Sequence, residues 1–145
     1  MKYRIATTDD LSILAKMNKE LAEDEQHRNR FMSIPELEER MRGFLKGKYE
    51  AIIFEDAGET VAYALFCDNG DHIYLRQLFV NRDHRRQGIG LKAMEILKNK
   101  ILSKNKRITV EVLSHNKSGY AFWRAVGFKD HSIELEMPVD EKGLP

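Results

Sequence analysis

A basic stretch of the chain, VNRDHRRQGIGL at residues 80–91, ends in the glycine pair Gly88 and Gly90. An apolar run precedes it and a helical pattern follows it, so the glycines stand where a strand turns into a helix. Glycine lets successive backbone N–H groups turn toward an anion, and the positive end of the next helix adds to the attraction. These residues predict a phosphate-binding loop, although a tight turn beside a solvated basic surface uses the same residue types.

The spacing of the glycines also matches a dinucleotide fingerprint, since Gly88, Gly90 and Ala93 follow the G-x-G-x-x-A pattern. In a dinucleotide fold the first glycine follows its strand almost directly, whereas seven residues separate Val80 from Gly88 here. No Gly-Lys-Ser/Thr follows the glycines, which excludes a Walker phosphate loop. A nicotinamide dinucleotide is therefore the weaker of the candidate ligands.

A second motif lies downstream, where Asn116 precedes the helical stretch AFWRAVGF at residues 121–128. Together the two motifs resemble the GNAT superfamily of N-acetyltransferases: residues 85–90, RRQGIG, are similar to its Arg/Gln-x-x-Gly-x-Gly/Ala signature, and Asn116 with the Gly-Phe ending is similar to its second motif. The order of strands and helices over residues 1–137 is similar to the whole family fold. The resemblance implies an α/β (α+β) fold with a mixed, mostly antiparallel twisted sheet of about six to seven strands, flanked by about four helices.

By this resemblance the co-substrate is acetyl-CoA, whose pyrophosphate lies on the backbone amides of the signature loop. Its pantetheine arm pairs with the backbone of residues 78–80, where an amide polarises the thioester oxygen. Asn116 bonds the pantetheine arm or positions the helix that follows. The coenzyme-binding residues implied are Leu78, Phe79, Val80, Arg85, Arg86, Gln87, Gly88, Ile89, Gly90, Leu91, Asn116 and Trp123.

The acceptor amine must lose a proton before it attacks, because a primary amine is almost all ammonium at neutral pH. Residues 72–80 carry no carboxylate where some relatives have their base. Glu111, on the neighbouring predicted strand, is the candidate base, aimed either at the site or at solvent. The acidic residues 23–25 and His27 are further candidates, and an exposed charged turn is the simpler interpretation of residues 23–25.

The family's usual acid is also missing, because Trp123 stands where many GNAT enzymes have a tyrosine that protonates the departing thiolate. Tyr120, one helical turn earlier, is the candidate acid, but it fits equally beside the coenzyme or in the core. A thiol with a pKa near ~8.5 is a tolerable leaving group without an acid. Trp123 is expected to pack with Phe122 and Phe128. Cys67 lies in an apolar run, which predicts a buried thiol rather than a nucleophile.

The elements that position these residues follow from the apolar periodicity. Alternating or continuous apolar runs predict strands at residues 2–6, 50–55, 60–67, 72–80, 108–113 and 131–137. Helical spacing predicts helices at residues 9–22, 33–47, 89–103 and 118–126. The strand-helix-strand order after residue 72 predicts a parallel pair with the glycine loop at its ligand-binding end.

Length and composition limit the remaining choices. A chain of 145 residues fits one domain, which we place at residues 1–137, followed by a frayed tail at residues 138–145. The net charge of +1 argues against a nucleic-acid partner, and no apolar run approaches the ~20 residues of a membrane span. The N-terminus lacks the apolar core of a secretory leader, so we expect a cytoplasmic protein. We assign no metal site.

The leading hypothesis is an N-acetyltransferase that uses acetyl-CoA and transfers the acetyl group directly to a primary amine of a small molecule or peptide. The alternative is a non-catalytic acyl-CoA sensor or interaction module, which the missing tyrosine and strand carboxylate favour. Acidic residues at 20–25 and 36–39 suggest a cationic acceptor such as a polyamine, an aminoglycoside or a lysine side chain. Homodimer formation is left open.

Overall fold

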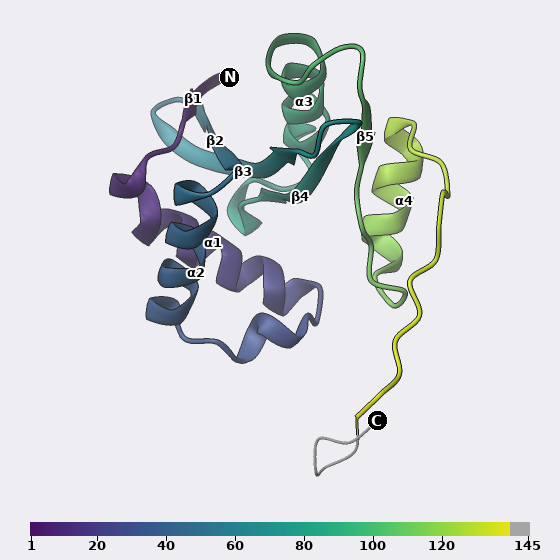
Figure 1. Ribbon diagram of the computed structural model, residues 1–145. Coiled ribbons are helices and arrows are strands. Elements are labelled where there is room, and N and C mark those ends of the chain that lie inside the picture. Colours follow the sequence, from purple (N-terminus) through teal and green to yellow (C-terminus); the bar gives the residue numbers. More distant parts are fainter. Residues whose placement is uncertain (140–145) are drawn as a thin grey trace.

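The computed structural model describes residues 1–139, which form a five-stranded sheet in the order β1-β2-β3-β4-β5 (Figure 1). The strands are β1 (Lys2–Ile5), β2 (Tyr49–Asp56), β3 (Glu59–Asp68), β4 (His72–Val80) and β5 (Arg107–Thr109). The first four strands are antiparallel neighbours, and β5 runs parallel to β4. The α-helices are α1 (Leu11–Asp24), α2 (Ile34–Lys46), α3 (Ile89–Ile96) and α4 (Lys117–Val126).

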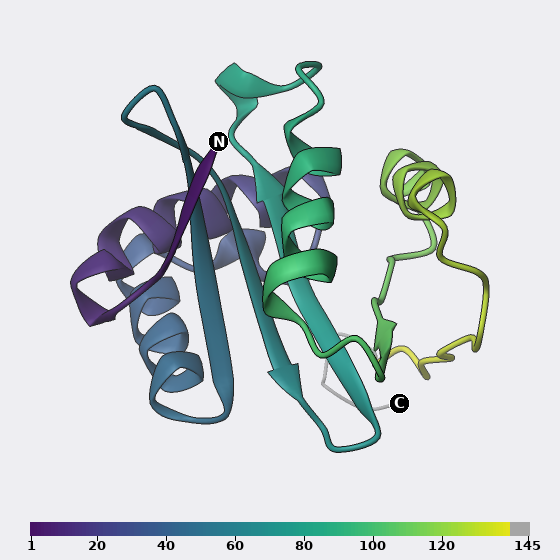
Figure 2. The same ribbon diagram turned by 90° about the horizontal axis from the view of Figure 1, so that it is seen from above.

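Helices cover both faces of the sheet, with α1 and α2 on one side and α3 on the other (Figure 2). Because successive strand residues point to opposite faces, β2 sends Ile52 and Phe54 toward the α3 layer and Ile53 toward the α1 and α2 layer. All three side chains are buried. The centre of β2, residues 51–54, is therefore continuously apolar rather than alternating, as a strand covered on both faces requires.

Capping residues fix where the helices of the α1 and α2 layer begin. Ser33 and Glu36 form a capping box at the start of α2, where the Ser33 hydroxyl accepts from the Glu36 N–H and Glu36 accepts from the Ser33 N–H. Thr7 and Asp10 make the same arrangement before α1. The two helix starts predicted from the sequence are thereby confirmed to within two residues.

A bulge in β4 decides the shape of the sheet next to β5. Leu65 of β3 stands opposite Gln77 while Phe66 stands opposite Leu75, so Arg76 is an extra residue in β4. The parallel pairing of β4 with β5 ends just before this point, at Tyr74. A bulge bends its strand and increases the local twist. Beyond Tyr74 the two strands therefore separate, and the β5 side of residues 75–80 carries no strand partner within residues 1–139.

Two predicted elements differ from the structure near β5. The predicted strand at residues 108–113 is reduced to Arg107–Thr109, because β4 bends away from it after Tyr74. The predicted helix at residues 89–103 is α3 followed by a π-helical turn at Leu97–Ile101. Both differences lie where the sheet opens.

The strand predicted at residues 131–137 is wrong, and the sheet has five strands rather than six or seven in the described part of the chain. Its alternating apolar side chains Ile133, Leu135 and Met137 are 86%, 90% and 74% exposed. Alternation predicts a strand only where an edge is available to pair with it, and β5 is too short to supply that edge. The predicted tail extends to residues 140–145, which lie outside the described residues.

The division into a domain at residues 1–137 and a tail stays a prediction. Among residues 1–139, no helix is both long and apolar enough to cross a membrane.

Candidate functional site

A cleft of about 500 Å³ lies where β4 and β5 separate. Its walls come from the bulged half of β4, the loop and first turn of α3, residues 110 and 111, the start of α4, and the end of α1. All of the coenzyme-binding residues predicted from the sequence line this cleft except Gln87. The structure thus gathers residues from two motifs that are about 30 positions apart around one opening.

The glycine loop presents free backbone donors to the cleft. Gly88 is the residue before α3 and has a φ of 73°, in the left-handed region that favours glycine. A Cβ at Gly88 would meet no atom within 4 Å, so open space lies in front of it. No side chain caps α3, and the first N–H groups of a helix have no intrahelical acceptor. This arrangement is suited to binding an anion.

Gly90 also allows close packing between α3 and α4, which the sequence did not indicate. A Cβ on Gly90 would lie 3.1 Å and 3.3 Å from two ring carbons of Phe122 in α4, and 3.7 Å from a methyl of Val80. The absence of a side chain at Gly90 lets the Phe122 ring approach the start of α3. Gly90 therefore sets the spacing of two cleft walls.

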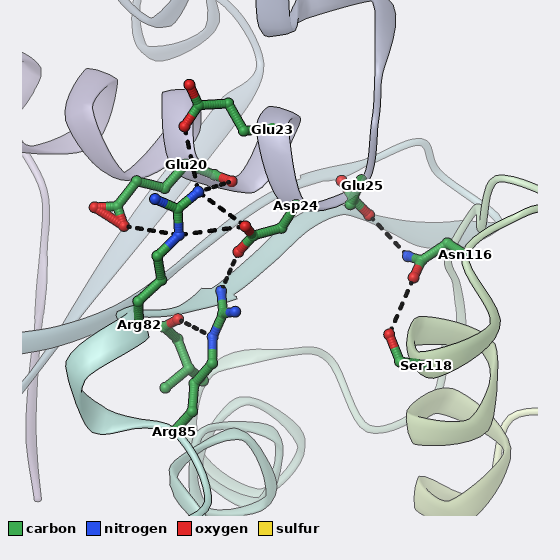
Figure 3. Close-up of polar contacts among 9 residues, drawn as sticks. Glu20, Glu23, Asp24, Glu25, Arg82, Arg85, Asn116 and Ser118 are labelled. Carbon is green, nitrogen blue, oxygen red and sulfur yellow. Dashed lines mark hydrogen bonds and ion pairs between the residues drawn. The ribbon is translucent and has the colours of Figure 1, made fainter.

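An ionic cluster ties the signature loop to the end of α1 (Figure 3). Asp24 accepts from Arg85 Nη2 at 2.6 Å and from Arg82 Nη2 at 2.8 Å, and Arg82 also pairs with Glu23 at 3.2 Å. Arg85 Nε donates to the Val80 carbonyl at 3.1 Å. Burial by itself raises the pKa of Asp24, but the hydrogen bonds from Arg82 and Arg85 outweigh it and hold that pKa below its ordinary value.

Glu25 is a carboxylate of the cleft wall, not part of an exposed turn. Its Oε2 accepts from Asn116 Nδ2 at 3.3 Å (Figure 3). Asn116 Oδ1 in turn accepts from the Gly119 N–H at 3.1 Å, which caps α4. Burial, followed by the charge of Asp24, raises the pKa of Glu25 above its ordinary value, while His115 opposes the shift. Asn116 therefore links the end of α1 to the start of α4.

The two catalytic candidates lie in different surroundings. Glu111 lines the cleft, and burial followed by the Glu111 carboxylate raises the pKa of nearby Tyr74 to about 12. Tyr120 is not among the cleft residues: it is 45% exposed, and its hydroxyl donates to Asp130 at 2.8 Å. That hydrogen bond raises the pKa of Tyr120. The structure brings Glu111 to the cleft and leaves Tyr120 outside it.

Two other side chains singled out by the sequence are held by packing. Trp123 lines the cleft and packs edge-on against Phe122 and Phe128, at ring-centroid distances of 5.0 Å and 5.2 Å. Cys67 is buried in β3 and is absent from the cleft lining, as its apolar surroundings predicted. Within residues 1–139, no three His, Cys, Asp or Glu side chains come together in a way that could hold a metal ion.

A smaller pocket of about 150 Å³ adjoins the cleft. The two share residues from α1, from the β4 bulge and from the segment after β5: Leu21, Glu25, Arg76, Gln77 and Glu111. Farther from the cleft, the smaller pocket is lined by His27 and Arg40. Burial, followed by the charge of Arg40, lowers the pKa of His27 below its ordinary value, which favours the neutral imidazole.

Sequence reasoning missed Arg40 and Arg76. The available signal for Arg40 is its position in the apolar stripe of α2, between Leu37 and Phe44 at helical spacing, where an arginine is unexpected. Arg76 lies within the predicted strand at residues 72–80, and its position in a bulge has no local sequence signal.

The comparisons with known proteins agree with this geometry. Residues 14–128 match the family model described as acetyltransferase (GNAT) family. A search of curated proteins finds no match.

Several solved structures share the fold. A mutant protein from Bacillus halodurans is 21% identical, with a TM-score of 0.78 over 96% of this chain and 99% of that one. A predicted acetyltransferase from Clostridium acetobutylicum, solved with acetyl-CoA, is 21% identical, with a TM-score of 0.74 over 94% of this chain and 95% of that one. A ribosomal-protein-alanine N-acetyltransferase from Brucella melitensis is 14% identical, with a TM-score of 0.75 over 94% and 98%.

Proposed function

Because the chain belongs to the acetyltransferase (GNAT) family, we propose that it transfers the acetyl group of acetyl-CoA to a primary amine of a small molecule or peptide. The observation that carries this proposal is the cleft between β4 and β5, whose lining combines the free amides of the Gly88 loop with the carboxylates of Glu25 and Glu111. A direct transfer is proposed, since the single cysteine is buried away from the cleft.

The residues of the cleft fit acetyl-CoA. The left-handed Gly88 and the uncapped start of α3 leave N–H groups for the pyrophosphate, with open space in front of them. The edge of β4 at residues 75–80 has no strand partner within residues 1–139 and suits an extended pantetheine arm. When bound, acetyl-CoA supplies the activated acetyl thioester. A backbone N–H of residues 78–80 would then polarise the thioester oxygen.

In the proposed reaction, Glu111 takes the proton from the acceptor ammonium, directly or through water. The bond from nitrogen to the acetyl carbon forms while the carbon-sulfur bond breaks, and the thiolate leaves. Tyr120 was the candidate acid, but its bond to Asp130 outside the cleft gives that role no support. We therefore propose that the thiolate leaves without a general acid, since a thiol with a pKa near ~8.5 is a tolerable leaving group.

A non-catalytic acyl-CoA sensor is the second candidate. Two observations favour it: Trp123 occupies the position of the family's usual acid, and the Tyr120 hydroxyl is held by Asp130. A cytoplasmic location and a homodimer also remain proposals. None of these alternatives changes the expected coenzyme site.

Turnover distinguishes the enzyme from the sensor. The release of free thiol from acetyl-CoA is measured with a panel of small amines and peptides, for the wild type, Glu111→Gln and the control Glu95→Gln. Loss of a general base lowers kcat/KM by about 10²–10⁴-fold. Glu95 is an exposed residue of α3 outside the cleft, so its variant should retain wild-type activity. Binding of acetyl-CoA without turnover of any amine would favour the sensor.

A further inference from the structure

The smaller pocket beside the cleft combines carboxylates and guanidinium groups, although the acidic surface of the sequence had suggested a purely cationic acceptor. Glu25 and Glu111 stand where the pocket meets the cleft, because they line both. Arg40 lines only the smaller pocket, and Arg76 lines both. A molecule in this pocket therefore meets carboxylates where the acetyl group arrives and a guanidinium farther in.

Arg40 is a half-buried cation without an acidic partner. No ion pair joins Arg40 to a carboxylate in the described residues, and its guanidinium carbon lies 4.8 Å from the centre of the Phe44 ring. Burial, followed by the charge of Arg76, lowers the pKa of Arg40 below its ordinary value. Charges removed from water are normally paired or bonded to a ligand, because an unpaired buried charge is costly.

A hydrogen bond and contacts with aromatic rings hold Arg76 in place. Its Nε donates to the Tyr49 hydroxyl at 2.9 Å, and its guanidinium carbon lies 5.1 Å to 5.4 Å from the ring centres of Phe44, Tyr49 and Tyr74. Aromatic faces attract a cation but leave its charge in place. The described part of the chain supplies no salt bridge to Arg76. Two guanidinium groups thus line one small pocket, and neither forms a salt bridge within the described residues, although the Glu111 carboxylate attracts Arg76 from nearby.

We propose, on the premise of the acetyltransferase activity above, that the acceptor is a small amine that also bears a carboxylate, which Arg40 and Arg76 bind. Its ammonium group lies between Glu25 and Glu111, beside the cleft, and its carboxylate lies toward Arg40. A planar guanidinium matches a carboxylate by two parallel hydrogen bonds. The pocket volume of about 150 Å³ suits a short amino acid, since pockets that bind drug-sized ligands measure roughly 300–1,000 Å³.

The Glu134 carboxylate could compete with the carboxylate of the ligand for Arg40 and Arg76, because Glu134 lines the same pocket. It stands on the C-terminal segment and lines the smaller pocket, yet it makes no ion pair with Arg40 or Arg76 in the described chain. Arg28 pairs with the nearby Glu136 instead, at 2.8 Å. A free carboxylate from a ligand therefore has access to the arginines, and removal of Glu134 should leave acceptor binding unchanged or stronger.

The test compares each amino acid with its amide, which keeps the amine and removes only the carboxylate. Acetylation of β-alanine, β-alaninamide, glycine, glycinamide and putrescine is measured with the wild type, Arg40→Gln and the control Arg42→Gln. Arg42 is on the same helix but pairs with Glu39 and does not line the pocket. For each protein, kcat/KM for the amino acid is divided by kcat/KM for its amide. Comparing this ratio between the wild type and the variant cancels the difference in amine basicity between the acid and the amide.

We expect Arg40→Gln to raise KM for the amino acids by about tenfold or more, with kcat and the amides little changed, because a charged hydrogen-bond pair is lost. Arg42→Gln should behave as the wild type. If Arg40→Gln does not fold, Arg40→Lys replaces it, and the lost fork geometry should still raise KM for the acids.

Equal use of acids and amides by the wild type and Arg40→Gln, or a preference for putrescine, would overturn the proposal. If no amine is acetylated, the proposed activity fails, but direct binding still decides this inference. Calorimetric binding of β-alanine to the wild type and its loss in Arg40→Gln would support the proposal, and no binding to the wild type would refute it.

Discussion

Replacing Gly90 by alanine tests whether this glycine serves the packing of α4 on α3. The added methyl carbon would lie 3.1 Å and 3.3 Å from Phe122 ring carbons and 3.7 Å from a Val80 methyl. Contacts at the first two distances are tighter than ordinary van der Waals contact, so the ring must move by a few tenths of an ångström. The same substitution at Gly43, inside α2, meets no atom within 4 Å.

Two opposing effects set the magnitude. Alanine in place of glycine stabilises a helix by about 0.5–1 kcal/mol, which is the expected gain for Gly43→Ala. Overpacking costs about 1–3 kcal/mol, so the free energy of unfolding of Gly90→Ala should lie between unchanged and about 2.5 kcal/mol lower. The two alanine variants should therefore differ by about 1–3 kcal/mol, which is the cost of the Phe122 contact.

Urea unfolding at equilibrium measures these differences, with constant m-values as the check that the folded and unfolded states are unchanged. The variant Phe122→Leu, alone and combined with Gly90→Ala, completes a double-mutant cycle. A smaller side chain at position 122 should make Gly90→Ala less destabilising. A Gly90→Ala protein that is stabilised as much as Gly43→Ala would refute the packing argument, and an additive cycle would remove Phe122 as its cause.

Three further predictions concern the contacts around the cleft. Because the pKa of Asp24 is lowered in the folded protein, the ionised Asp24 stabilises the fold above the unfolded pKa of about 3.9, and this stabilisation is lost as the pH falls through the folded pKa. The free energy of unfolding, measured with urea, should therefore fall more on acidification for the wild type than for Asp24→Asn. Gly119→Ala would place a Cβ 2.3 Å from Asn116 Nδ2, and loss of the cap should lower the free energy of unfolding by about 0.5–2 kcal/mol, which thermal and urea unfolding would measure. Tyr120→Phe should leave kcat within a few-fold of the wild type, because the hydroxyl is bonded outside the cleft, and a kcat loss of about 10²-fold or more would instead indicate a general acid.

The order of the strands and helices up to α4 was predictable because these elements carry their own periodicity, and the helices α1 and α2 also have capping residues of their own. The capping box of Ser33 and Glu36 and the left-handed Gly88 are signals within a few residues of the features they set. The same holds for the proposed phosphate-binding loop, whose chemistry would depend on backbone groups of one short segment. Features of this kind can be predicted from the sequence because they do not depend on residues far away in the chain.

The remaining features depend on contacts between distant residues. Asp24 and Arg85 are 61 positions apart, so their ion pair has no local signal, and residues 23–25 were interpreted as an exposed turn. The bulge at Arg76 depends on the register of β3, yet it opens the cleft and ends β5. The alternating residues at 131–137 satisfied the local rule for a strand but found no edge to pair with.

The central claim is that the Gly88 loop and the open side of β4 bind acetyl-CoA. Calorimetric titration of the wild type with acetyl-CoA, and with NADH as the control ligand, tests it most directly. Gly88→Glu adds a carboxylate where the pyrophosphate is proposed, and Gly88→Ala carries the backbone strain at a φ of 73° without the charge. The account predicts saturable 1:1 binding of acetyl-CoA but not NADH, weakened far more by Gly88→Glu than by Gly88→Ala. No binding of acetyl-CoA to the wild type, or equal binding to Gly88→Glu, would contradict it.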